Sequence, residues 1–128
     1  MYKMYKRFLM LAALSAFTAV GFGAFGAHGL KARLDEHMMA VYQTGVQYHF
    51  WHALGLGLIA TLVRFHPASA LLRWAGMLMF AGILVFSGSL YVLAISGIGW
   101  LGAITPFGGT AFLAAWLLVA MFAAKLDE

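Results

Sequence analysis

Two histidines three positions apart are the residues of this sequence best suited to chemistry. On a helix, His49 and His52 would lie about 60° apart and could address one centre. His28 ends the preceding hydrophobic stretch. Neutral imidazoles are ligands for divalent metals and for haem iron. One hypothesis is therefore a metal or haem site formed by His28, His49 and His52.

The same side chains have a structural interpretation, which we prefer. Histidine, glutamine and hydroxyl side chains form hydrogen bonds between membrane helices, and two histidines spaced by three are a weak metal motif. The chain has no cysteine, so it offers no thiolate ligand or thiol nucleophile. We predict no catalytic residue and no bound cofactor. We expect a cluster of hydrogen-bonding side chains: Gln47, Tyr48, Ser87, Ser89 and Thr105.

The elements that carry these residues are strongly apolar. The 128 residues are 64% hydrophobic and only 9% charged, with a mean hydropathy of +0.91. Soluble domains are usually about 25% charged, so cytosolic enzymes and disordered regulators are excluded. Eight Lys and Arg are too few for a nucleic-acid surface, and we expect no nucleic-acid partner. The composition predicts one integral membrane domain, residues 1–128, surrounded by lipid.

Long stretches without charge locate the membrane spans. A span needs about 20 apolar residues, and lipid-exposed backbone must be helical or form a closed barrel. The stretches are continuously apolar, which favours helices over barrel strands. The longest, 74–124, must fold back, and Gly, Ser and Pro place its turn within 96–106. We predict an all-α four-helix bundle with spans at 8–27, 46–63, 74–95 and 107–124.

An amphipathic segment, 34–45, is predicted between the first two spans. Its apolar residues recur every three or four positions at Leu34, Met38, Val41 and Tyr42. This segment should lie flat at the outer interface or extend the second helix outward by two or three turns. Gly29 and Gly45 are candidate hinges.

Basic residues predict the orientation. Six of them flank the spans on one side and two lie on the other, and an excess of Lys and Arg marks cytoplasmic loops. Both termini are therefore expected in the cytoplasm. The first stretch also begins like a secretory signal, but its apolar run exceeds about 15 residues, so we expect a retained span. The larger basic set is Lys3, Lys6, Arg7, Arg64, Arg73 and Lys125, and the smaller set is Lys31 and Arg33.

No acidic or basic residue lies within the predicted spans, which argues against ion pumps and proton-coupled exporters. Small residues four apart, such as Ala12 with Ala16 and Ala53 with Gly57, favour close helix contacts. We therefore prefer a non-enzymatic structural, accessory or assembly component, with other membrane proteins or further copies of itself as partners. One alternative is a small oligomeric transporter or channel whose polar route is lined by His28, Gln47, His49 and His52. The other is the metal- or haem-binding protein.

Three local patterns resemble a known family. They are Gly23-Ala-Phe-Gly-Ala-His-Gly-Leu30, then Tyr42-Gln-Thr-Gly-Val-Gln-Tyr-His-Phe-Trp-His-Ala-Leu54, then Phe86-Ser-Gly-Ser-Leu-Tyr91 with Thr105-Pro-Phe-Gly-Gly109. The sequence is similar to the YgdD-like inner-membrane proteins, the domain of unknown function DUF423, whose eukaryotic relative is transmembrane protein 256. The resemblance implies a four-span protein of the bacterial inner membrane and supplies no activity. It implies importance for His28, Gln47, His49, His52, Ser87, Ser89, Thr105 and Pro106.

Overall fold

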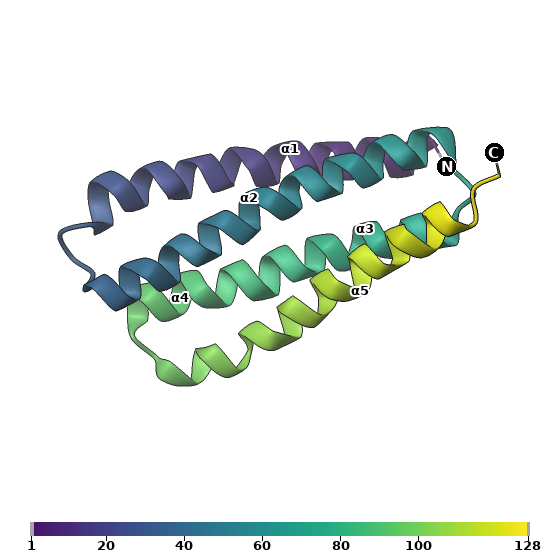
Figure 1. The fold of residues 1–128 in the computed structure, drawn as a ribbon. Helices are drawn as coiled ribbons and strands as arrows, with labels where there is room; N and C mark the ends of the chain where they lie inside the picture. The colour runs from purple at the N-terminus through teal and green to yellow at the C-terminus, as the bar shows by residue number, and fades with distance from the viewer. Residues whose placement is uncertain (1, 128) are drawn as a thin grey trace.

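A computed structural model describes residues 2–127, and each regular element in that range is a helix. One turn of π-helix, η1, continues α1, and a second, η2, joins α3 to α4. The described residues therefore form four helical rods, of which α3, η2 and α4 together make the third (Figure 1). The elements are α1 Tyr2–Phe25, η1 Gly26–Leu30, α2 Glu36–Phe65, α3 Ala70–Gly82, η2 Ile83–Ser87, α4 Gly88–Ser96, the 3-10 helix η3 Gly99–Ala103 and α5 Thr105–Ala124.

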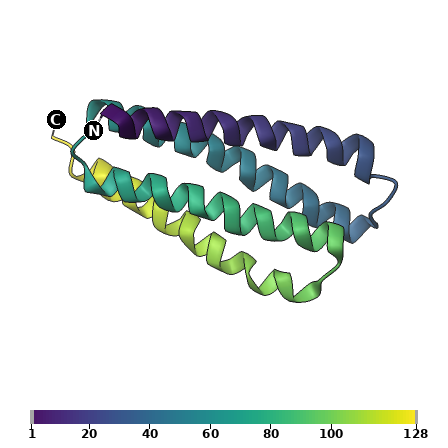
Figure 2. The same cartoon turned by 180° about the vertical axis from the view of Figure 1, so that it is seen from behind.

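The four rods run side by side with short connections. α1 packs along α2, α5 packs along α3 and η2, and α2 also contacts the third rod (Figures 1 and 2). The two ends of the chain lie at one end of the bundle, and the loop from η1 to α2 lies at the other (Figure 1). The second rod thus has α1 on one side and the third rod on the other.

Local sequence signals set where the helices begin and end. The carboxylate of Asp35 accepts a hydrogen bond from the backbone N–H of Met38, 2.7 Å away, and caps α2. Ser69 caps α3 through the N–H of Leu72. Gly97 ends α4 in the left-handed conformation, with φ 74°, and Pro106 lies in the first turn of α5. The predicted turn within 96–106 is therefore confirmed.

The core consists of apolar side chains from all four rods, and small residues let the rods approach. Leu56, Ile59, Leu72 and Met79 are fully buried in its centre. A Cβ added to Gly57 would lie 3.8 Å from the Cβ of Ala12, which is ordinary contact between α2 and α1. Both belong to the small residues that were expected to favour close helix contacts.

Among residues 2–127, three helical stretches are long and apolar enough to cross a membrane: Lys3–Leu30, Ala70–Ser96 and Gly99–Ala124. They contain three of the four predicted spans. The 30-residue helix α2 is not among them, and its middle carries the polar residues Gln47, Tyr48, His49 and His52. The span predicted at 46–63 therefore stays a prediction.

The predicted amphipathic segment forms the first turns of α2, which is the second of its two expected arrangements. Tyr42 is buried with Leu30 and Ala94, and Leu34 and Val41 pack against this group. Gly45 is not a hinge, because α2 continues through it without a break.

Candidate functional site

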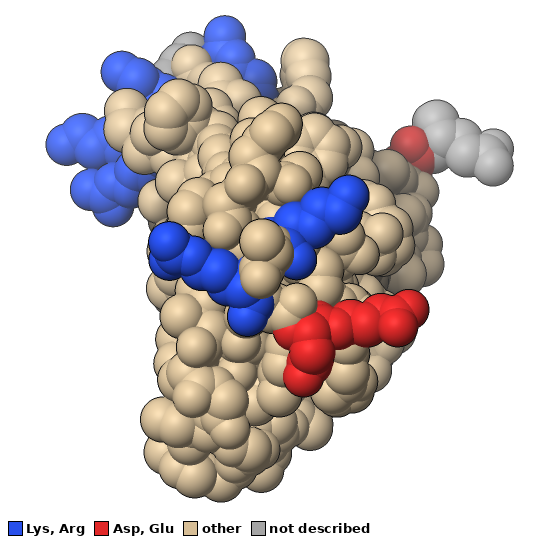
Figure 3. Space-filling view, turned by 90° about the vertical axis from the view of Figure 1, so that its left-hand side faces the viewer, with Lys and Arg blue, Asp and Glu red and all other residues tan. Residues whose placement is uncertain are grey.

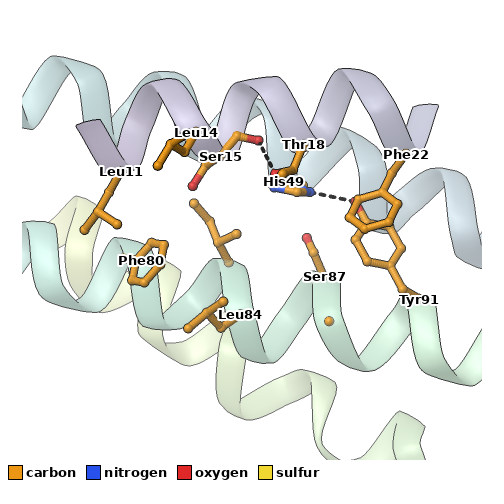
Figure 4. A pocket seen from close by; sticks show the side chains of 12 residues that line it. Leu11, Leu14, Ser15, Thr18, Phe22, His49, Phe80, Leu84, Ser87 and Tyr91 are labelled. Carbon is orange, nitrogen blue, oxygen red and sulfur yellow. Dashed lines mark hydrogen bonds between the residues drawn. The ribbon is translucent and has the colours of Figure 1, made fainter. Parts of the chain in front are cut away.

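A polar network centred on His49 connects α1, α2 and α4. The His49 ring is 5% exposed. Its Nδ1 lies 2.8 Å from the Tyr91 hydroxyl, and its Nε2 lies 3.2 Å from the Thr18 hydroxyl. The Thr18 hydroxyl in turn donates to the backbone carbonyl of Ser15 at 2.9 Å. Figure 4 shows these groups on the facing sides of α1 and the third rod.

The hydrogen bonds assign the protonation of the His49 ring. The Thr18 hydroxyl donates its only hydrogen bond to the Ser15 carbonyl. Its oxygen therefore accepts a hydrogen bond from the Nε2–H of His49. Nδ1 is then an acceptor, and the Tyr91 hydroxyl donates to it. With a neutral ring protonated at Nε2, each of these linked groups has a hydrogen-bond partner. The arrangement therefore holds an uncharged imidazole.

Aromatic side chains surround this network. The ring of Tyr91 packs against those of Phe22 and Tyr42, with centroids 4.7 and 5.2 Å away. The Tyr42 hydroxyl donates to the backbone carbonyl of Phe22 at 2.6 Å. A Cβ on Gly26 would lie 2.4 Å from the Tyr42 ring, so this position must be glycine for the ring to fit. The first quoted sequence pattern therefore contains a packing site for Tyr42.

A cavity of about 380 Å³ lies beside the network, between α1 and the third rod (Figure 4). Its deep walls include the buried residues Ser15, His49 and Ser87. Its rim includes Leu14 and Leu84, which are 55% and 60% exposed, so it opens sideways rather than along the bundle axis. The side chains that line it are uncharged.

Ser87 and Ser89 occupy two further sites beside the π-helical turn η2. Ser87 is 1% exposed and donates to the backbone carbonyl of Gly45 in α2 at 2.8 Å. Ser89 bonds to the carbonyl of Phe86 at 2.9 Å and to the Thr105 hydroxyl at 2.6 Å. The Thr105 hydroxyl thus joins α5 to α4, and no side-chain hydrogen bond caps the start of α5.

The three histidines of the predicted metal site lie in different surroundings. His52 faces α5, where its ring stacks on Phe112 at 3.6 Å, and its Nδ1–H donates to the Tyr48 carbonyl at 2.7 Å. His28 is exposed on η1 and donates to the Ala24 carbonyl at 2.9 Å. Within residues 2–127 no group of three His, Cys, Asp or Glu side chains is placed to hold a metal ion. The geometry does not favour the metal or haem hypothesis.

The predicted polar cluster is dispersed. Ser87 contacts α2, Ser89 contacts Thr105, Tyr48 stacks near His52, and Gln47 is exposed. Sequence reasoning missed the residues that do gather around His49, namely Ser15, Thr18 and Tyr91. The available signal was the three-residue spacing of Ser15 and Thr18, which puts two hydroxyls on one side of an otherwise apolar helix.

Comparison with known proteins identifies relatives without assigning an activity. Residues 22–109 match the family described as a protein of unknown function, DUF423. The UPF0382 membrane protein YwdK of Bacillus subtilis is 49% identical over 77% of this chain and 80% of its own length. A UPF0382 membrane protein of Staphylococcus haemolyticus is 47% identical over 72% of this chain and 74% of its own length. No solved structure matches the chain.

Proposed function

The chain belongs to the DUF423 family of membrane proteins of unknown function, and from this premise we propose that it is a non-enzymatic accessory or assembly component. It acts by binding another transmembrane helix with the outer face of α1. The partner is a second copy of the chain or a different membrane protein. The matched relatives are named as membrane proteins, which supports placing this action in the lipid bilayer.

The observation that carries the proposal is a hollow of about 720 Å³ on the outer face of α1. Ala13, Ala16 and Gly21 contribute small side chains to it, and a Cβ added to Gly21 meets nothing within 4 Å. Phe17 and Phe25, both largely exposed, are also among its lining residues. In lipid, helices associate through close van der Waals packing at small residues, which this surface permits.

We propose four membrane crossings, with α2 as the fourth. α2 packs between α1 and the third rod, where His49 is buried, and its other histidine, His52, is buried against Phe112 of α5. This shielding offsets the cost of polar side chains at membrane depth. The polar residues that lowered its hydropathy therefore do not prevent it from crossing with the other three.

We propose the bacterial inner membrane, with both termini in the cytoplasm. Lys3, Arg7 and Arg73 line one hollow of about 260 Å³ at the end that carries the termini. Figure 3 looks onto the opposite end, where the loop before α2 places basic and acidic side chains together. Basic residues concentrated at one end support a cytoplasmic position for it.

Matched substitutions on α1 and α5 test the proposed contact. Ala13→Leu adds bulk to the hollow, and Ala120→Leu adds the same bulk to an exposed position of α5. In mild detergent, cross-linking and co-purification should recover a partner with the wild type and with Ala120→Leu. Ala13→Leu should lose about 90% of it, because the helix contact needs close approach. Equal recovery with both variants, or a wild type that is only monomeric, would contradict the proposal.

The polar route of the transporter hypothesis receives less support. Among its four residues, His28 and Gln47 are exposed, while His49 and His52 are buried against different helices. These positions do not form one continuous path. Elemental analysis and an absorption spectrum of the purified protein remain the direct measurement for the metal or haem hypothesis.

A further inference from the structure

Ser15 differs from the other helical hydroxyls of this protein. Thr44, Thr61 and Thr110 each donate to the backbone carbonyl four residues earlier, as serine and threonine usually do within helices. The Ser15 hydroxyl makes no hydrogen bond in the described part of the chain, although the residue is only 6% exposed. Figure 4 shows it pointing from α1 into the cavity between α1 and the third rod.

Among the described side chains that line the cavity, Ser15 has the one hydroxyl that donates no hydrogen bond. Thr18 donates to the Ser15 carbonyl, and Ser87 donates to the Gly45 carbonyl. In the assigned tautomer, Tyr91 donates to His49, whose own N–H goes to Thr18. A hydroxyl left without a partner in an apolar site costs free energy, which a ligand that accepts its proton recovers.

The cavity has the size and walls expected for a small ring system. A volume of about 380 Å³ is roughly two and a half times the 150 Å³ of an apolar protein cavity that binds benzene. Phe22, Phe80 and Tyr91 contribute aromatic rings to the walls, and aromatic side chains pack favourably against flat rings. Because the lining is uncharged, a charged molecule would be bound poorly.

We propose that this cavity binds an uncharged, membrane-dissolved ring compound of the quinone class, with one ring carbonyl accepting the hydrogen bond of Ser15. The ring enters from the bilayer between Leu14 and Leu84, where the cavity opens sideways. This site shares Thr18 and Phe22 with the outer hollow of α1 but lies on the side of the third rod, and the proposal does not depend on the proposed helix partner. A lipid acyl chain, which cannot accept a hydrogen bond from the Ser15 hydroxyl, is the competing occupant.

Two probes with the same bicyclic carbon skeleton, of which only one carries carbonyl groups, distinguish these occupants. Binding of para-naphthoquinone and of naphthalene is measured by equilibrium dialysis against the purified full chain in detergent. The chain has no cysteine, so the quinone has no thiol to alkylate. We expect saturable binding at one site, with the quinone bound about tenfold more tightly, the factor that one good hydrogen bond supplies.

Three variants make the test specific. Ser15→Ala should remove the tenfold preference and leave naphthalene binding unchanged, whereas Ser96→Ala, at the end of α4, should retain the preference. Gly88 lines the cavity, and a Cβ there meets nothing within 4 Å, so Gly88→Leu should fill the space and abolish binding of both probes. The proposal is overturned if neither probe saturates, if both bind equally to the wild type, or if Ser15→Ala keeps the preference.

Discussion

At the scale of single residues, the structure uses His49 as a connector between helices. Its ring accepts a hydrogen bond from Tyr91 on α4 and donates one to Thr18 on α1, while its backbone belongs to α2. Three helices are therefore fixed relative to one another by one side chain. In an apolar interior such groups are costly to leave unpaired, so each member depends on the next.

Two threonines allow this connection to be tested with one type of substitution. Thr18→Val removes the acceptor of the His49 N–H, and we expect it to lower the free energy of unfolding by about 1 kcal/mol. Thr61→Val removes only a bond to the Gly57 carbonyl on an exposed face, and we expect a change below about 0.5 kcal/mol. Reversible unfolding in mixed micelles measures both, and equal losses would contradict the role of Thr18.

At the scale of helical elements, the close approach of α5 to η2 determines how the third and fourth rods pack. A Cβ on Gly108 would lie 2.3 Å from the backbone nitrogen of Phe86, which a flexible side chain cannot relieve. A Cβ on the adjacent Gly109 would lie 3.8 Å from the Phe86 ring, an ordinary contact. Consecutive glycines of one motif therefore have different structural requirements.

This difference gives a prediction for the Gly-Gly pair. Gly108→Ala should push α5 away from η2 and lower the free energy of unfolding by about 1–3 kcal/mol, as overpacking does. Gly109→Ala should be neutral or should stabilise α5 by up to about 1 kcal/mol, because alanine is the better helix former. Thermal unfolding of both variants in the same detergent measures these two changes in stability. A Gly108→Ala protein as stable as the wild type would show that the two helices are further apart.

At the scale of the whole molecule, the arrangement of the rods puts the two termini at one end of the bundle. The basic residues follow the same division, with Lys3, Arg7 and Arg73 around one hollow there and Lys31 and Arg33 at the far end. Termini at one end of the bundle are consistent with the four crossings proposed above, and the excess of basic residues at that end is consistent with the proposed cytoplasmic side.

Reporter fusions test the crossings and the orientation together. Reporters at the N-terminus and at the C-terminus should both be active only on the cytoplasmic side, and one inserted in the loop between η1 and α2 only on the opposite side. The two terminal fusions act as controls for each other. Termini found on opposite sides would mean an odd number of crossings, and α2 would then be excluded as a span.

The sequence by itself determined the helices of this protein. Each predicted span lies almost entirely within an observed rod, and the turn within 96–106 and the helical start of α2 were readable from Gly, Pro and apolar spacing. These features are local, because hydropathy, caps and turn residues act over a few positions. The predicted hinge at Gly45 failed because that glycine serves a contact with Tyr91, distant in the sequence.

Only the tertiary structure decided which side chains meet. By spacing alone His49 and His52 could address one centre, but the rotation of α2 turns His49 towards α1 and α4 and His52 towards α5. In a soluble helix a polar face marks the outside, whereas here lipid and protein interior are both apolar. Hydropathy therefore gives no signal for the inward face of each helix, and only packing brings Ser15, Thr18, His49 and Tyr91 together.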